Sequence, residues 1–199
     1  MKKFELTNEF ITNSYGVKLF RVKALVEFGD VEAGELGGYI EKEGNLSQYG
    51  NAWVYGDAQV YGNAQVYGDA WVYGDARVCG DARVYGNTWV YGNAWVSDNA
   101  RVSGNARVCD NAWVYGDARV SGDALVCGDG DYAYAHGFGS VNRTTTFFRL
   151  KDGGVGVRCG CFYGTLPEFR DKIRETHGET KKAQEYLMLA DLMKLRFEK

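Results

Sequence analysis

The sequence predicts a mainly β protein organised around a parallel β-helix, a triangular prism with about 18 residues in each coil. One observation is a six-residue unit, Gly-Asn/Asp-Ala-X-Val-Tyr/Cys/Ser, which repeats without an insertion over residues 50–128. Another is that Ala and Val alternate with X and Tyr, which places Ala and Val on one side of a short strand. The third is the Gly-Asn/Asp pair, which tolerates the positive φ of a corner, so that three units close one coil.

Composition and charge narrow the possible function classes. The 199 residues are enough for one domain with a sizeable core. The net charge of −3 gives no general reason to expect binding to duplex nucleic acid. The sequence shows neither an apolar signal-peptide region nor a run of about 18 apolar residues, so we expect no signal peptide and no membrane span. The five cysteines form no paired framework, which favours a reduced, cytoplasmic setting.

Residues 18 apart fall on the same face of the prism, which gives the three faces different surfaces. Six aromatic side chains gather on the first face, and two more tryptophans lie on the second. An exposed aromatic patch of this size usually marks a protein contact, so we expect a homo-oligomer interface there. The alternative is an aromatic ladder that only stabilises neighbouring coils. The predicted interface residues are Trp53, Tyr55, Trp71, Tyr73, Trp89 and Tyr91 on the first face, with Trp95 and Trp113 on the second.

The third face carries an arginine column, formed by Arg83, Arg101 and Arg119. Strands of neighbouring coils lie about 4.8 Å apart, so the guanidinium groups repel one another unless an anion lies between them. An anion or phosphate site is therefore one interpretation of the column. The other is that the guanidinium groups splay into solvent over Tyr67 and Tyr85, where charges are weakly coupled.

Both ends of the prism need a cap, because an open solenoid end exposes its core. We expect an N-terminal β cap over residues 1–39. Two alternating segments predict strands at 4–11 and 17–26, with a turn at 13–16 between them.

The β-helix itself is expected over residues 40–130, starting with an atypical first coil. If the regular spacing is extended backwards, Ile40 and Leu46 fall at Ala positions and Gln48 falls at a Val position. These substitutions predict an irregular coil that joins the repeat to its cap.

Residues 131–199 are expected to form a C-terminal module, a β-hairpin followed by two helices that cover the other end of the prism. A capping box begins the first helix, since Thr165 is followed three residues later by Glu168. The predicted elements are strands at 142–149 and 155–162, one helix from 165 to near 178, and a second helix at 180–197. The buried candidates on the second helix are Tyr186, Leu187, Ala190, Met193, Leu195 and Phe197.

A predicted loop at residues 136–146 is the main candidate for ligand binding. Its glycines permit close approach of the backbone, and its side chains offer many hydrogen-bond donors. These groups suit an anionic or nucleotide-like ligand, with Arg143 opposing the charge and tyrosines stacking on a ring. The alternative is a polar connector that satisfies its own backbone. The candidate ligand-binding residues are His136, Ser140, Asn142, Arg143, Thr145, Tyr132 and Tyr134, together with Arg83, Arg101 and Arg119.

The C-terminal module also contains both histidines of the chain, His136 and His177, and the pair Cys159 and Cys161. A zinc site needs four ligands at about 2.0–2.3 Å, and nothing in the sequence places a histidine beside a thiol. We therefore expect the two cysteines to pack as small hydrophobic residues, and we predict no metal site.

The repeat resembles the hexapeptide-repeat family, whose members form left-handed parallel β-helices. Flanking motifs are similar to those of a bacteriophage or prophage-type group within it: Phe28-Gly-Asp, Leu36-Gly-Gly-Tyr-Ile-Glu-Lys-Glu, and Cys161-Phe-Tyr-Gly-Thr-Leu-Pro-Glu-Phe. The resemblance implies a left-handed coil, a homotrimer and, for a phage-encoded member, the host cell cytoplasm. It supplies no catalytic motif that can be carried over to this chain.

Three functions are compatible with this sequence. The one we expect is a non-enzymatic, oligomeric binding protein that holds an anionic or nucleotide-like ligand without a cofactor, such as a phage counter-defence sponge for a host nucleotide signal. The alternative is a hexapeptide-type acyltransferase that uses acetyl-CoA. That class uses a catalytic histidine, and His136 is the candidate base because the repeat contains no histidine. The third is a structural or protein-blocking role through the aromatic face.

Overall fold

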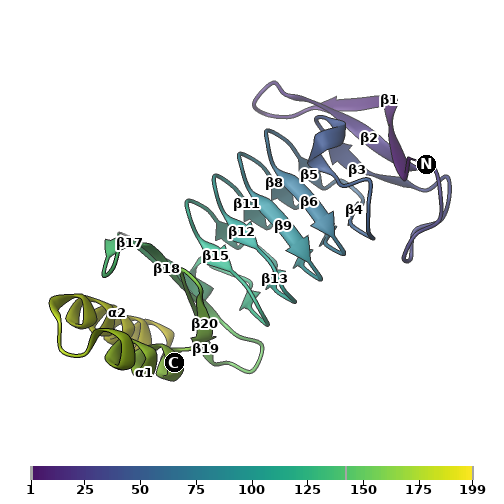
Figure 1. Ribbon diagram of the computed structural model, residues 1–199. Coiled ribbons are helices and arrows are strands. Elements are labelled where there is room, and N and C mark those ends of the chain that lie inside the picture. Colours follow the sequence, from purple (N-terminus) through teal and green to yellow (C-terminus); the bar gives the residue numbers. More distant parts are fainter. Residues whose placement is uncertain (1, 142, 199) are drawn as a thin grey trace.

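The computed structural model describes residues 2–141 and 143–198. The repeat forms a parallel β-solenoid with three faces, as the six-residue unit predicts. Its coils lie in a row between antiparallel strands at the N-terminal end and a small sheet with two helices at the C-terminal end (Figure 1). This arrangement confirms the predicted fold class, while the left-handed sense of the coil stays a prediction from the resemblance.

Each face of the solenoid is one parallel sheet in which every strand pairs with the equivalent strand of the next coil. The pairing of Arg101 with Arg83 on one side and Arg119 on the other shows this register directly. The sorting of residues into three faces is therefore confirmed. The first sheet contains β4 (Trp53–Val54), β7 (Trp71–Val72), β10 (Trp89–Val90), β13 (Arg107–Val108) and β16 (Leu125–Val126). The second contains β3 (Leu36–Ile40), β5 (Gln59–Val60), β8 (Arg77–Val78), β11 (Trp95–Val96) and β14 (Trp113–Val114). The third contains β6 (Gln65–Gly68), β9 (Arg83–Gly86), β12 (Arg101–Val102) and β15 (Arg119–Val120).

The bore of the solenoid is filled by the repeated Ala and Val side chains. From Ala52 to Val126 these residues are at most 1% exposed. Thr88, which stands in an Ala position, is also buried, and its hydroxyl donates a hydrogen bond of 2.6 Å to the Tyr85 carbonyl. Each buried Val contributes roughly 1.5–2 kcal/mol, so the coils stabilise one another as long as both ends are covered.

Substitution of a corner glycine is expected to destabilise the solenoid by an amount that depends on the neighbouring coil. Gly104 and Gly56 have φ of 76° and 59°, where a side chain costs about 1–2 kcal/mol. A Cβ on Gly104 would lie 2.7 Å from the backbone nitrogen of Gly122, whereas one on Gly56 would meet nothing within 4 Å. Gly104→Ala should therefore cost about 1–3 kcal/mol more than Gly56→Ala. Chemical denaturation of both variants measures the difference, and equal losses would contradict this account of the corners.

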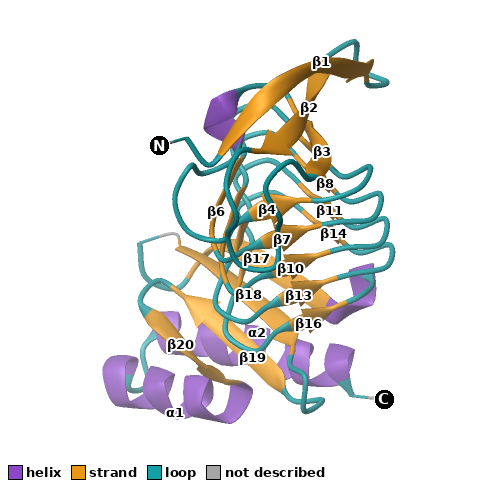
Figure 2. Ribbon diagram, turned by 90° about the vertical axis from the view of Figure 1, so that its right-hand side faces the viewer, coloured by secondary structure: helices purple, strands orange, loops and turns teal. Residues whose placement is uncertain are grey.

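The N-terminal cap is an antiparallel pair of strands, β1 (Phe4–Thr12) and β2 (Lys18–Ala24), which confirms the predicted strands. Strand β2 pairs with β3, which in turn pairs in parallel with β5, so the cap continues directly into the second sheet. Figure 2 shows these strands above the stacked coils. They close the first end of the bore.

The first coil has a different register from the one the sequence predicts. Ile40 pairs with Val60, and Leu46 bridges Val66, so both fill Val positions and the expected Ala positions are wrong. This coil is longer than the others, because the chain between Leu46 and Val54 is two positions longer than a repeat unit. Gln48 lies outside the bore, and its Oε1 accepts a hydrogen bond of 2.8 Å from the Lys3 backbone nitrogen. The short 3-10 helix at Glu43–Asn45 precedes this insertion.

The C-terminal module is a four-stranded antiparallel sheet covered by two helices. The predicted returning strand at 155–162 is split, because a turn at Gly160 and Cys161 separates β19 from β20. The predicted helices and the capping box at Thr165 are confirmed. Leu195 is 70% exposed, so its predicted burial is wrong: the buried face of α2 passes through Met193 and Phe197 instead. The elements are a 3-10 helix at Asp129–Asp131, β17 (Tyr132–Phe138), β18 (Arg143–Arg149), β19 (Val155–Cys159), β20 (Phe162–Thr165), α1 (Leu166–His177) and α2 (Lys181–Phe197).

Strand β18 joins this module to the last coils of the solenoid. The Arg119 backbone nitrogen donates a hydrogen bond of 2.9 Å to Thr146 Oγ1, and Ala124 forms a β-bridge with Leu150. None of the helices in the described part of the chain is long and apolar enough to cross a membrane. The joint fixes the module against the last strands of the third and first faces, and the third face carries the arginine column.

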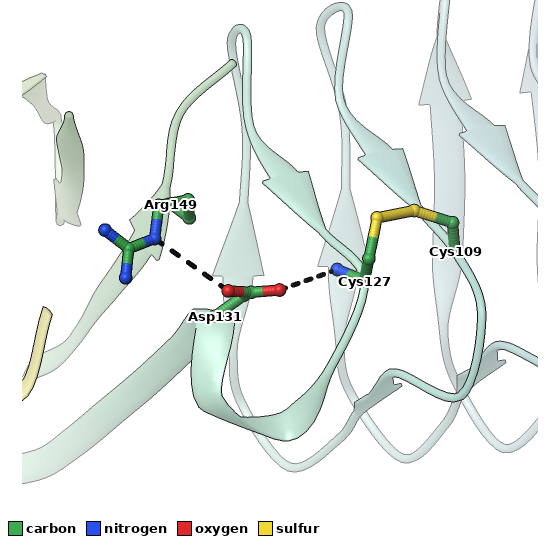
Figure 3. The surroundings of a disulfide bond; sticks show 4 residues. All are labelled: Cys109, Cys127, Asp131 and Arg149. Carbon is green, nitrogen blue, oxygen red and sulfur yellow. Dashed lines mark hydrogen bonds and ion pairs between the residues drawn. A yellow bond between two sulfur atoms is a disulfide. The ribbon is translucent and has the colours of Figure 1, made fainter. Parts of the chain in front are cut away.

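A disulfide connects Cys109 with Cys127 beside this joint, so the expectation of unpaired cysteines is wrong for these two residues (Figure 3). They occupy equivalent positions of neighbouring coils, and their Cα atoms are 4.4 Å apart. Asp131 accepts a hydrogen bond of 3.0 Å from the Cys127 backbone nitrogen and lies 3.8 Å from Arg149 Nε. The disulfide and this ion pair both lie where the last coil meets the C-terminal module.

Candidate functional site

One cavity of about 780 Å³ brings together the two ligand sites that the sequence suggests separately. We call it the arginine cavity. The arginine column forms one wall, and the β17–β18 hairpin with the turn between β19 and β20 forms the other. The lining residues are Asp81, Arg83, Asn99, Arg101, Asp117, Arg119, His136, Val141, Arg143, Thr144, Gly160 and Cys161.

The solenoid wall places three like charges on adjacent strands. Arg83, Arg101 and Arg119 stand in register on β9, β12 and β15, so neighbouring guanidinium groups repel one another. Within the described residues, the arginines that form ion pairs are Arg21, Arg149, Arg170 and Arg174, none of which lines the cavity.

Acidic corner residues lie beside the column but do not balance its charge. Asp81, Asn99 and Asp117 form the neighbouring corner column, in which Asn99 Nδ2 donates a hydrogen bond of 3.2 Å to Asp117 Oδ1. Four arginines and two aspartates line the cavity, which leaves two positive charges in excess. The alternative of solvated guanidinium groups over two tyrosines is supported in part, since Arg83 and Arg101 are exposed and oppose the rise in pKa that burial of Tyr67 causes. No described arginine–ring contact joins the column to Tyr67 or Tyr85, whose rings stack on each other at 4.9 Å.

The opposite wall is a hairpin, so the predicted loop at 136–146 is wrong for most of its length. His136 belongs to β17 and Thr144 to β18, and His136 Nδ1 lies 2.9 Å from Thr144 Oγ1. Arg143 begins β18, and its guanidinium group lies directly against Gly160 in the turn after β19. The hairpin therefore adds a fourth arginine and the exposed His136 to the three arginines of the column.

Several candidate residues lie outside the cavity. Thr145 is buried, and its hydroxyl donates a hydrogen bond of 3.2 Å to Cys159 Sγ. Ser140 does not line the cavity either, and its backbone nitrogen donates to the Tyr186 hydroxyl at 3.1 Å. Asn142 lies outside the described residues.

Tyr132 and Tyr134 line a different pocket with Trp113 and Tyr115. Burial raises the pKa of Tyr132, and burial together with the neighbouring Tyr115 phenol raises the pKa of Tyr134.

The aromatic face differs from its prediction at one end. Trp53 is fully buried beneath Phe4 and Phe28, whose ring centroids lie 6.2 and 5.3 Å away, so its assignment to an oligomer interface is wrong. The other predicted interface residues retain exposed surface, from the half-buried Tyr55 to Trp113 at 43% exposure.

Stacking between coils accounts for much of this aromatic surface. Trp71 stacks on Trp89 with centroids 6.0 Å apart, Tyr73 stacks on Tyr91 at 5.0 Å, and Trp95 stacks on Trp113 at 5.0 Å. These contacts support the alternative of a stabilising ladder, and the interface stays a prediction.

Some residues that line the arginine cavity are not among those predicted from the sequence. Asp81, Asn99 and Asp117 recur at the coil spacing two positions before the arginines, so the repeat itself contained the signal for them. Gly160 and Cys161 carried no signal for this cavity, because only the packing of the C-terminal sheet brings their turn to it. The expectation that Cys161 packs like a buried hydrophobic residue is wrong, since Cys161 is exposed in this turn, whereas Cys159 is buried as expected. Within the described chain, Cys109, Asp110 and Cys127 form a group of metal-ligand type, but both sulfurs belong to the disulfide.

Comparison with known proteins identifies the repeat. Six overlapping segments match a family model described as the YdcK Beta solenoid repeat, and together they cover residues 58–92 and 94–128. No curated protein matches the chain. The matched family describes the solenoid and its repeat, and the ligand of the arginine cavity has to be argued from the cavity's own chemistry.

Proposed function

We propose that this chain, whose repeats match the YdcK beta-solenoid repeat family, is a non-enzymatic binding protein that holds a phosphate-bearing, nucleotide-like ligand in the arginine cavity. The observation that supports the proposal is the set of four arginines around one cavity, none of them in an ion pair with a described residue. An anion between Arg83, Arg101 and Arg119 would replace repulsion by charge-assisted hydrogen bonds.

The geometry of the column favours phosphate groups over a single small carboxylate. Guanidinium groups present paired N–H donors that match phosphate oxygens, and the arginines repeat along the solenoid at about 4.8 Å. An extended ligand with two phosphates can therefore contact arginines of neighbouring coils, while Arg143 approaches from the hairpin. His136 supplies a further donor or acceptor on the same wall.

The biological part of the proposal rests on the sequence resemblance. A phage-encoded homotrimer with a left-handed coil would act as a counter-defence sponge, which sequesters a nucleotide signal of the host. The surface that remains for self-association includes Trp71, Trp89 and Trp113. If this surface forms the trimer, Trp71→Glu should yield monomers in sedimentation velocity, and a variant that stays oligomeric would refute that interface.

Isothermal titration calorimetry tests the binding function. Wild-type protein should bind pyrophosphate, and it should bind at least one member of a panel of cyclic nucleotides and ADP-ribose. Affinity should fall as the salt concentration rises, because the attraction is largely electrostatic. No heat with any of these compounds at low ionic strength would refute the proposal.

An acyltransferase is the second candidate, because His136 lines the arginine cavity and has its ring held by Thr144. In that case the unbonded nitrogen of His136 would act as general base, and the arginines would hold the phosphates of acetyl-CoA. Acetyl-CoA turnover that is lost in His136→Ala, with pyrophosphate binding retained, would support the enzyme. Absence of CoA binding would exclude it.

A further inference from the structure

A second pocket of about 350 Å³ adjoins the arginine cavity, and Arg143 and Cys161 line both. We call it the ring pocket. It lies between the C-terminal sheet and the helices α1 and α2. Its wall includes Phe162, Phe169, Ile173, Thr176, His177 and Tyr186. The two hollows thus meet at the first residue of β18 and at the turn between β19 and β20.

The ring pocket has the opposite chemistry to the arginine cavity. Flat side chains dominate its wall: Phe162 packs against Phe169 with centroids 5.4 Å apart, and His177 stacks on Tyr186 at 5.9 Å. The polar groups lie at the edges: Lys172 and Thr176 are exposed on α1, and Arg143 lies at the junction with the arginine cavity. The hydroxyls of Ser140 and Tyr186, 3.3 Å apart, also belong to the lining. Such a wall suits a flat, largely apolar ring, whereas the arginine cavity suits phosphate.

We infer that the two hollows form one bipartite site for a nucleotide, with the phosphates on the arginine column and the base in the ring pocket. This inference rests on the proposed function and adds the part of the ligand that is not phosphate. Arg143 stands at the junction, where its guanidinium group can contact a phosphate or stack on the base. The predicted stacking tyrosines, Tyr132 and Tyr134, line another pocket and have no part in this arrangement.

Three probes separate the two halves of the site: pyrophosphate for the arginine cavity, ADP for both halves, and adenosine for the ring pocket alone. ADP carries no more negative charge than pyrophosphate, so charge cannot explain tighter binding of ADP. Base stacking should make ADP bind about 10-fold tighter or more than pyrophosphate in calorimetry. Equal affinity for the two would overturn the inference and leave the proposed function intact. No binding of pyrophosphate would instead count against the proposed function.

A matched pair of variants locates the base. Thr176→Trp fills the ring pocket from an exposed position on α1, while Glu179→Trp places the same side chain at an exposed position that lines neither hollow. Thr176→Trp should reduce ADP affinity to that of pyrophosphate and leave pyrophosphate binding unchanged. Glu179→Trp should change neither the affinity for ADP nor the affinity for pyrophosphate. If Thr176→Trp binds ADP as tightly as wild type, the base does not occupy the ring pocket.

Cys161 provides an independent readout at the junction. Of the three free cysteines, all within the described residues, Cys79 and Cys159 are buried and Cys161 is exposed, so a maleimide should react with Cys161. Saturating ADP should slow this reaction several-fold in wild-type protein, measured by mass spectrometry. In the Thr176→Trp variant, ADP should slow the labelling of Cys161 by maleimide no more than pyrophosphate does. An unchanged labelling rate with saturating ADP would place the nucleotide away from this junction and overturn the inference.

Discussion

Replacing Trp53 with alanine is expected to lower the free energy of unfolding by about 3–5 kcal/mol, the largest stability effect predicted for this chain. Trp53 is fully buried between the first coil and the N-terminal cap, where Phe4 and Phe28 pack edge-on against its ring. Removing the indole leaves a cavity at the point where the cap closes the bore. Denaturant unfolding followed by circular dichroism measures the loss.

Two further variants make this test specific. Trp113→Ala removes a tryptophan from the equivalent repeat position on the second face, where the side chain is 43% exposed, and should cost about 1 kcal/mol. Trp53→Phe keeps an aromatic ring and removes an indole N–H that has no partner among the described residues, so it should cost less than Trp53→Ala. Equal losses for Trp53→Ala and Trp113→Ala would show that Trp53 does not anchor the cap.

Arg101→Ala is expected to weaken pyrophosphate binding by about 10–100-fold, because a hydrogen bond to a charged group contributes about 1.5–3 kcal/mol. Arg101 is the central member of the arginine column and lies between Arg83 and Arg119. The substitution should not reduce stability, since it removes an exposed charge placed between two like charges. Calorimetry and thermal unfolding of the same preparation measure both effects.

Arg77 offers the matched control for this prediction. It occupies the same position of the repeat on the second face and lies outside the arginine cavity. Arg77→Ala changes the net charge of the protein equally, so it should leave pyrophosphate affinity within about 2-fold of wild type if binding is local. Similar losses of pyrophosphate affinity in Arg101→Ala and Arg77→Ala would mean that pyrophosphate binding depends on the net charge of the protein, without a specific site in the arginine column.

The solenoid could be predicted in detail because the sequence signals that specify it are local and recur every six residues. Each six-residue unit specifies a strand and a corner, and stacking then places equivalent residues of neighbouring coils in contact. The arginine column, the aromatic stacks and the buried Ala and Val positions all follow from that one period. The capping box formed by Thr165 and Glu168 could also be predicted, because the two residues lie within a single helical turn.

The remaining features depend on contacts between segments that share no period. The burial of Trp53 requires Phe4 and Phe28 from the cap, and the changed register of the first coil depends on an insertion that no repeat reveals. Likewise, the meeting of Arg143 with the arginine column depends on how β18 packs against β15. The arginine column and the residues of the hairpin could each be identified in the sequence, but their proximity could not be predicted from it.

A crystal structure of the protein grown with saturating pyrophosphate would show directly whether the arginine cavity binds phosphate. Phosphate oxygens are expected within hydrogen-bond distance, about 3 Å, of at least two guanidinium groups among Arg83, Arg101, Arg119 and Arg143. Pyrophosphate bound elsewhere, with the arginine cavity holding only solvent, would contradict the claim that this cavity is a phosphate site.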